Sequence, residues 1–115
     1  MPRFKLVFFS PIANTQPILH HLFEQFPRNV GKIGAYGGCA FVTRGTGQFI
    51  PLEGANPTIG SVGAPERVEE DRVEVVVQSD ASGPGDSDVK RVLEELKKVH
   101  PYEEVAYDVY RLEEF

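Results

Sequence analysis

Hydrophobic and polar residues alternate near the start of the chain and then recur at helical spacing. Residues 3–9 alternate and then become apolar, and their valine and phenylalanine content favours a β-strand. Ser10 and Pro11 interrupt this pattern. We expect the following helix to have Pro17 in its first turn and to end at Pro27. The apolar positions that define this amphipathic helix are Ile18, Leu19, Leu22, Phe23 and Phe26.

The second half of the chain repeats the order of strand and helix. Residues 68–78 have an apolar centre and predict a strand, which a polar, glycine-rich link over residues 79–85 follows. Asp86 or Ser87 is suited to cap the next helix, because short polar side chains accept hydrogen bonds from the free N–H groups of a first turn. Residues 105–112 alternate again and predict a final strand. The stripe of the second helix comprises Val89, Val92, Leu93, Leu96 and Val99.

Two short apolar runs lie between these halves. Residues 40–43 and 48–50 predict two strands joined by a tight connection over residues 44–47. The repeated order of strand, helix and strand predicts an α+β fold, the ferredoxin-like split βαβ sandwich, with an antiparallel sheet and two helices on one face. Because the last strands carry apolar residues on both sides, we expect another subunit to cover the open face of the sheet.

Composition is that of a globular protein, and we expect a single domain over residues 1–115. Hydrophobic residues make up 41% of the chain and charged residues 25%. A formal net charge of −5 disfavours sequence-independent binding to nucleic acid, which needs clustered Lys and Arg. The first apolar segment is too short to span a membrane, and no signal-peptide cleavage site follows it. We therefore expect a cytoplasmic protein without nucleic-acid or membrane partners.

Residues 33–60 are rich in glycine and proline. Their last ten residues belong to a long loop that we expect over residues 51–65. Loops of this length in compact domains are usually functional or form interfaces. Glu53 is the only ionisable residue in it, so the loop suits contact with an anion or a neighbouring subunit better than acid–base chemistry. The glycines of residues 45–47 do not form a phosphate-binding loop, because the required Gly-Lys-Ser/Thr sequence is missing.

Cys39 and the paired histidines give weak chemical signals. A lone cysteine excludes an internal disulfide and an all-cysteine metal site. Thiol catalysis needs a neighbouring base, which the sequence does not place beside Cys39, so we expect a small buried apolar residue there. His20 and His21 are adjacent on a helix and point in different directions. They do not form a two-histidine ligand pair, and at least one should face solvent.

The turn after the second helix has a structural and a functional interpretation. His100 suits the negative end of the helix, and Pro101 ends it. In the functional interpretation, His100 and Glu103 or Glu104, joined by Glu53, bind a divalent cation or meet a partner subunit's loop. Imidazole together with carboxylate suits zinc or a similar transition metal. Both interpretations stay open at this point.

Two long motifs together resemble the NGG-interacting-factor-three-like proteins. The first is Ile33-Gly34-x-Tyr36-x-x-Cys39-x-Phe41, continued by Gly45-x-Gly47-x-Phe49-x-Pro51-x-x-Gly54-Ala55-x-Pro57-x-Ile59-Gly60. The second is His100-Pro101-Tyr102-Glu103-Glu104-x-Ala106-Tyr107-Asp108-x-Tyr110. The resemblance covers nearly the whole chain and is to the family's inserted domain. It implies a fold of the PII and CutA type, which tends to form trimers.

The resemblance does not carry the family's dimetal chemistry to this chain. By the resemblance, segments that flank the inserted domain supply a dimetal site in the full-length family, and because residues 1–115 match the inserted domain alone, we expect no such site in them. The link over residues 79–85 is also longer and richer in glycine than the family's usual turn. We therefore carry over no role for the start of the second helix.

The resemblance implies a stand-alone, non-enzymatic binding or regulatory module without a cofactor. We expect a homo-oligomer, a trimer above all, that works alone or docks onto a separate protein supplying the missing flanks. The alternative is a divalent-metal-binding protein of the CutA type that uses His100 and Glu103, and an enzyme that uses Cys39 has the least support. The candidate ligand or interface residues are Tyr36, Cys39, Glu53, Asn56, His100, Tyr102, Glu103 and Glu104.

Overall fold

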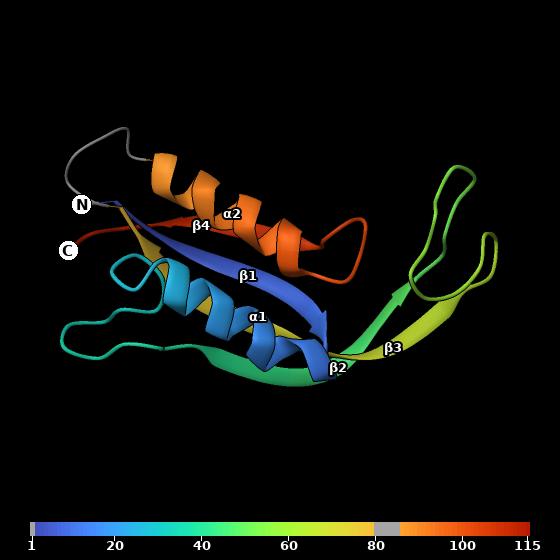
Figure 1. Cartoon of the computed structure of the whole chain (residues 1–115), viewed down its shortest axis with the longest axis horizontal. Helices are drawn as coiled ribbons and strands as arrows, with labels where there is room; N and C mark the ends of the chain where they lie inside the picture. The colour runs from blue at the N-terminus through green and yellow to red at the C-terminus, as the bar shows by residue number, and fades with distance from the viewer. Residues whose placement is uncertain (1, 80–85) are drawn as a thin grey trace.

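A computed structural model describes residues 2–79 and 86–115 (Figure 1). Its strands and helices form one four-stranded sheet in the order β2-β3-β1-β4, with every neighbouring pair antiparallel. Both helices cover the same face of this sheet (Figure 1). This arrangement confirms the predicted ferredoxin-like split βαβ fold. The elements are β1 (Arg3–Pro11), α1 (Ile12–Gln25), β2 (Phe41–Phe49), β3 (Glu66–Gln78), α2 (Ser87–Val99) and β4 (Tyr107–Leu112).

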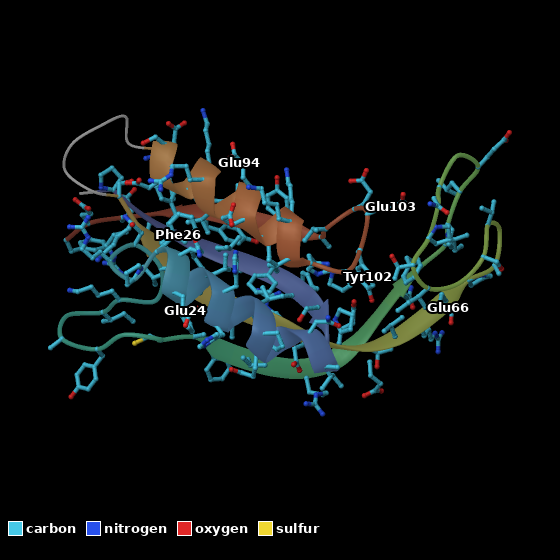
Figure 2. All side chains as sticks on the ribbon, viewed as in Figure 1. Glu24, Phe26, Glu66, Glu94, Tyr102 and Glu103 are labelled. Atoms are coloured by element: carbon cyan, nitrogen blue, oxygen red, sulfur yellow. The ribbon has the colours of Figure 1, made fainter. Side chains whose placement is uncertain are left out.

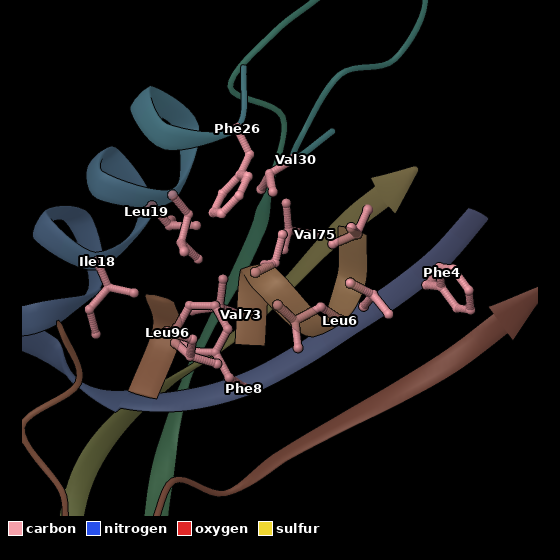
Figure 3. Close-up of a cluster of buried hydrophobic side chains, with 14 residues drawn as sticks. Phe4, Leu6, Phe8, Ile18, Leu19, Phe26, Val30, Val73, Val75 and Leu96 are labelled. Atoms are coloured by element: carbon pink, nitrogen blue, oxygen red, sulfur yellow. The ribbon is translucent and has the colours of Figure 1, made fainter. Parts of the chain in front are cut away.

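The hydrophobic core fills the space between the helices and the sheet (Figure 3). Alternate residues of β1 point into it, and the antiparallel register places Phe8 opposite Val73 and Leu6 opposite Val75. All four side chains are at most 1% exposed. The predicted stripes of α1 and α2 pack on this layer, so the apolar periodicity of the sequence correctly located the core.

Helix α1 begins earlier than the sequence predicted. It starts at Ile12, directly after β1, and Pro17 lies inside it instead of in its first turn. The proline ring removes the N–H that would bond to the carbonyl of Ala13 four residues earlier. Ala13 and Pro17 are both exposed, so water can satisfy that carbonyl and the helix continues. The predicted end before Pro27 is confirmed within two residues.

Strand β2 is one continuous strand, not the two short strands that the sequence predicted. Each residue from Phe41 to Phe49 pairs with a residue between Glu74 and Glu66 of β3. Gly45 and Gly47 therefore extend the strand and do not reverse the chain. Strand β3 begins two residues earlier than predicted and β4 two residues later.

The far ends of β2 and β3 extend beyond the helices as an arm (Figure 1). We define the arm as residues 45–49, the connecting loop of residues 50–65 and residues 66–70. The described structure measures 46 × 26 × 25 Å, with a radius of gyration of 15.2 Å. A compact domain of this length would have a radius of gyration of about 13 Å. The arm makes the molecule elongated.

Residues 31–39 form a separate segment at the opposite end from the arm (Figure 1). At its base, the N–H of Gly31 donates to the Val76 carbonyl and the Gly31 carbonyl accepts from the N–H of Cys39, both at 2.8 Å. Gly31 has a φ of +70°, and a Cβ atom there would lie 2.6 Å from the Phe23 ring. The prediction that Cys39 is buried is wrong: it is only half-buried, because this segment stands away from the core.

The sheet face opposite the helices carries apolar and charged side chains together. Val7 and Val76 point to this face by strand alternation and are buried. Beside them, the Arg72 guanidinium lies 5.9 Å from the centre of the Phe9 ring and 3.7 Å from the Glu74 carboxylate. Cover of this face by another subunit stays a prediction.

The start of α2 is only partly described. Residues 80–85 of the predicted polar link lie outside the described residues. Asp86 occupies the predicted cap position, but its side chain makes no capping hydrogen bond. No helix in the described ranges is long and apolar enough to cross a membrane.

Candidate functional site

A groove of about 530 Å³ lies where the arm meets the turn after α2. Its charged residues are Glu70, Glu103 and Glu104, and no described lysine or arginine lines it. Figure 2 shows Tyr102 and Glu103 on the turn and Glu66 on the arm. We call this feature the acidic groove. Its apolar surface comprises Phe9, Phe49, Ile50, Pro51, Leu52, Ala55, Pro57, Ile59 and Ala106.

Hydrogen bonds between the arm loop and the turn hold the walls of the acidic groove together. The backbone N–H of Asn56 donates to Glu103 Oε1 at 2.8 Å. The Thr58 hydroxyl donates to the Pro101 carbonyl at 2.9 Å. These contacts fix a long loop against a turn that is distant in sequence, so the groove is largely pre-formed.

Tyr102 also lines the groove. Its hydroxyl donates to Glu70 Oε2 at 3.1 Å, and its ring centre lies 6.4 Å from that of Phe49. Burial, the negative charge of Glu70 and this hydrogen bond raise the pKa of Tyr102 to about 12. The phenol is therefore protonated near neutral pH and acts as a hydrogen-bond donor to Glu70.

His100 anchors the turn to β1. The backbone N–H of Tyr102 donates to His100 Nδ1 at 3.1 Å, so the ring proton is on Nε2, which donates to the Phe9 carbonyl at 2.7 Å. The side chain is 6% exposed. Burial lowers the pKa of His100, although its bond to Phe9 and the charge of Glu70 oppose this shift. A neutral, structural imidazole fits these surroundings.

The metal interpretation of His100 and Glu103 gains no support from this geometry. Both nitrogens of the His100 ring are used in hydrogen bonds, and Glu103 accepts one from Asn56. Within residues 2–79 and 86–115, no group of three His, Cys, Asp or Glu side chains is placed to hold a metal ion. A metal at His100 would have to displace one of the ring's two hydrogen bonds, and the site stays a prediction.

The structure brings most of the predicted site residues to one place. Asn56 and the predicted residues of the turn all lie at or beside the acidic groove. Glu53 lies in the same loop as Asn56, but its side chain is exposed and does not line the groove. Tyr36 and Cys39 lie in the segment at the opposite end of the molecule (Figure 1). The predicted residues therefore form two separate sites.

Sequence reasoning missed Glu70, Phe9 and Phe49 as groove residues. Glu70 lies in β3, where it reads as one of several charged residues on an exposed strand. One signal could have found it: Glu66, Val68 and Glu70 alternate and share one side of the strand. The sequence predicted a start of β3 at residue 68, two residues too late, so this alternation was not recognised as part of the strand.

A second polar cluster, also missed, ties the start of α1 to the sheet. Asp71 is 4% exposed and accepts hydrogen bonds from the Thr15 hydroxyl at 2.6 Å and from Arg44 Nε at 3.1 Å. The hydroxyl of Ser10 lies 2.7 Å from that of Thr15 and completes the cluster. Because the Asp71 carboxylate has two donors, the cluster is satisfied internally and serves the fold.

Comparison with known proteins assigns the chain to a family, although no family model matches it. The GTP cyclohydrolase 1 type 2 homolog of Mycobacterium leprae (strain TN) is 41% identical over 108 residues, which span 94% of this chain and 26% of that protein. The crystal structure of a Bacillus cereus protein related to NIF3 is similar, with a TM-score of 0.76 and 35% identity. That match covers 98% of this chain and 26% of the other.

The fold is also similar to that of a smaller protein. The divalent cation tolerance protein CutA from Archaeoglobus fulgidus matches with a TM-score of 0.65 and 17% identity, over 98% of this chain and 86% of that one. At this identity the likeness concerns the fold alone, which is PII/CutA-like. The chain spans about a quarter of the length of the curated relatives that it matches. In sequence and in fold, the chain belongs to the NGG-interacting-factor-three-like family, whose curated members are named GTP cyclohydrolase 1 type 2 homologs.

Proposed function

We propose that residues 1–115 form a cytoplasmic, non-enzymatic binding or regulatory module that works as a homo-oligomer, with a trimer as the favoured state. The acidic groove is its contact site for an apolar segment that carries positive charge. The observation that carries this proposal is the composition of the groove: an extended apolar surface whose described charged residues are all acidic. A partner with the opposite charge and an apolar surface would complement it.

The exposed apolar surface of the arm supports oligomerisation. Ile50 is 52% exposed and Leu52 71%, and both line the acidic groove from the loop that joins β2 to β3. Apolar residues grouped in this way on a protein surface mark interaction sites. An arm that extends beyond its own core is stabilised when another chain packs against it.

The chemistry of the groove favours binding over catalysis. Tyr102 keeps its proton because its pKa is raised to about 12, and both ring nitrogens of His100 are hydrogen-bonded. Cys39, the candidate nucleophile, lies at the other end of the molecule and contacts the Gly37 carbonyl. General acid–base or nucleophilic catalysis needs such groups beside a common reacting centre.

The mass of the protein in solution tests this proposal. Light scattering after size exclusion at micromolar concentration should give a multiple of the 12.8 kDa chain mass. Leu52→Asp places a carboxylate in the acidic groove and should lower that mass. Val62→Ser changes another exposed apolar residue of the same loop, one outside the groove lining, and should leave the mass unchanged. A monomeric wild-type protein would overturn the proposal.

A further inference from the structure

A small β-hairpin displays two apolar side chains at the end of the molecule opposite the arm. The N–H of Ile33 donates to the Tyr36 carbonyl at 2.8 Å, and the N–H of Tyr36 donates to the Ile33 carbonyl at 2.9 Å. Gly34, with a φ of +57°, is the first of the two turn residues, as tight hairpins prefer. Ile33 and Tyr36 therefore oppose each other directly and share one face. We call residues 32–36 the tip hairpin.

The tip hairpin exposes this pair from a fixed base. Ile33 is 53% exposed and Tyr36 is 76% exposed. The base is fixed because Val30 forms a β-bridge with Val77 and Gly31 bonds to the backbone of β3 and to Cys39. An aromatic residue held rigidly in solvent is a typical anchor of a protein interface, because little conformational entropy is lost when it docks.

The charge around the tip hairpin is opposite to that of the acidic groove. Residues 25–43, which lead into the hairpin and out of it, contain Arg28 and Lys32 and no aspartate or glutamate, in a chain of net charge −5. Lys32 belongs to the hairpin, where its ammonium group donates to the Gly34 carbonyl at 2.8 Å. The groove combines three glutamates with an apolar surface. The two ends of the molecule are therefore complementary in charge and in apolar character.

We propose that the tip hairpin of one copy docks in the acidic groove of a second copy. Ile33 and Tyr36 pack against the apolar surface around Leu52, and Lys32 approaches the glutamates at the rim. The two sites lie at opposite ends of a 46 Å molecule, so the contact runs head to tail (Figure 1). Head-to-tail contacts form a closed ring when the rotation between copies closes. This inference rests on the proposed function and identifies the segment that fills the groove.

Two variants that each lose one half of the contact provide the test. The first combines Ile33→Ser with Tyr36→Ser and keeps the groove; the second is Leu52→Asp and keeps the hairpin. All three residues are more than half exposed, so circular dichroism should show unchanged folding. Each variant alone should be monomeric by light scattering. An equimolar mixture should form a dimer, because one intact hairpin then meets one intact groove. Val62→Ser, at a site as exposed as Ile33, is the matched control.

Charge reversal tests the role of Lys32 separately. Lys32→Glu should weaken association about two- to five-fold at low salt, the size expected of an exposed ion pair. Glu104→Lys in the same chain should restore part of the loss, because the reversed charges again face each other across the contact. Sedimentation velocity at low and high salt measures both effects. If Lys32→Glu leaves association unchanged, or if Glu104→Lys does not restore it, Lys32 does not take part in the contact.

The outcomes separate this inference from the proposed function. A wild-type monomer overturns both. If Leu52→Asp dissociates the oligomer but the hairpin variant retains the wild-type mass, the groove holds another segment, so this inference is wrong and the proposed function stands. If neither variant dissociates, the contact lies elsewhere and the inference is again wrong. Two monomeric variants that fail to form a dimer when mixed also contradict it.

Discussion

Gly31 occupies a backbone position that other residues fit poorly. Its φ of +70° costs a side-chain-bearing residue about 1–2 kcal/mol, and an added Cβ would also press on Phe23 and the Cys39 carbonyl. We predict that Gly31→Ala lowers the free energy of unfolding by about 1–3 kcal/mol, measured by urea denaturation. Gly37→Ala is the control, since open space surrounds Gly37 and its φ is not positive; its effect should be within about 0.5 kcal/mol. Equal losses in both variants would contradict this account.

His100 should make stability depend on pH. Its pKa in the folded protein is below the ordinary value of 6.5, so the unfolded chain takes up a proton that the folded chain resists. The free energy of unfolding is therefore complete above about pH 6.5 and falls as the pH drops from there through the lowered pKa. Urea denaturation between pH 7.5 and 5.5 should show a decline that is smaller in His100→Gln. NMR titration of the wild-type ring checks the cause directly, and a pKa at or above 6.5 would refute it.

At the scale of elements, the buried Asp71 cluster connects α1 to β3. Thr15→Val keeps the shape of the side chain and removes the hydroxyl that bonds to Asp71. We predict a loss of about 1–3 kcal/mol in the free energy of unfolding, because a buried carboxylate loses a donor. The other donor, Arg44, is 62% exposed, so Arg44→Ala should cost only about 0–1 kcal/mol. Chemical denaturation of the two variants measures the difference, and a larger loss in Arg44→Ala would show that the cluster is organised differently.

The elements that the sequence predicted well are those with one buried face. The residues of β1 and α2 that face the core are apolar, as Phe4, Leu6 and Phe8 show, so the periods of two and 3.6 residues are visible in the chain. Strand β2 has no buried residue, so no apolar period marks it in the sequence. Gly45 and Gly47 suggested a turn, because their pairing with β3 is made by the backbone and leaves no side-chain pattern. Pro17 led to a wrong prediction of where α1 begins. On the exposed side of the helix, water can replace the backbone hydrogen bond that a proline cannot donate, so the helix extends on both sides of it.

The candidate site was predicted only in part because its contacts are long-range. The turn after α2 and Asn56 were proposed from their residue types, but the bond between Asn56 and Glu103 joins residues 47 positions apart. Glu70 and Phe9 come from two different strands and meet the turn only after the sheet has formed. The second site, around Tyr36, depends on a two-residue turn whose exposure the sequence does not reveal.

The elongated shape of the molecule suits association between copies. The core supports the sheet and helices, whereas the arm and the tip hairpin project from opposite ends and expose apolar side chains (Figure 1). The two surfaces are complementary in charge, which favours fast and specific encounter between copies. Association should therefore weaken with rising salt, as sedimentation velocity at two ionic strengths would show. An oligomer that strengthens with salt would indicate a purely apolar contact elsewhere.

Mixing the two variants shows whether the tip hairpin of one copy binds the acidic groove of another. Light scattering should give monomers for the hairpin variant and the Leu52→Asp variant separately, and a dimer when they are combined, at twice the chain mass of 12.8 kDa. Such recombination requires a contact between two different surfaces, one from each copy. A mixture that remains monomeric, or single variants that keep the wild-type mass, would contradict the head-to-tail contact.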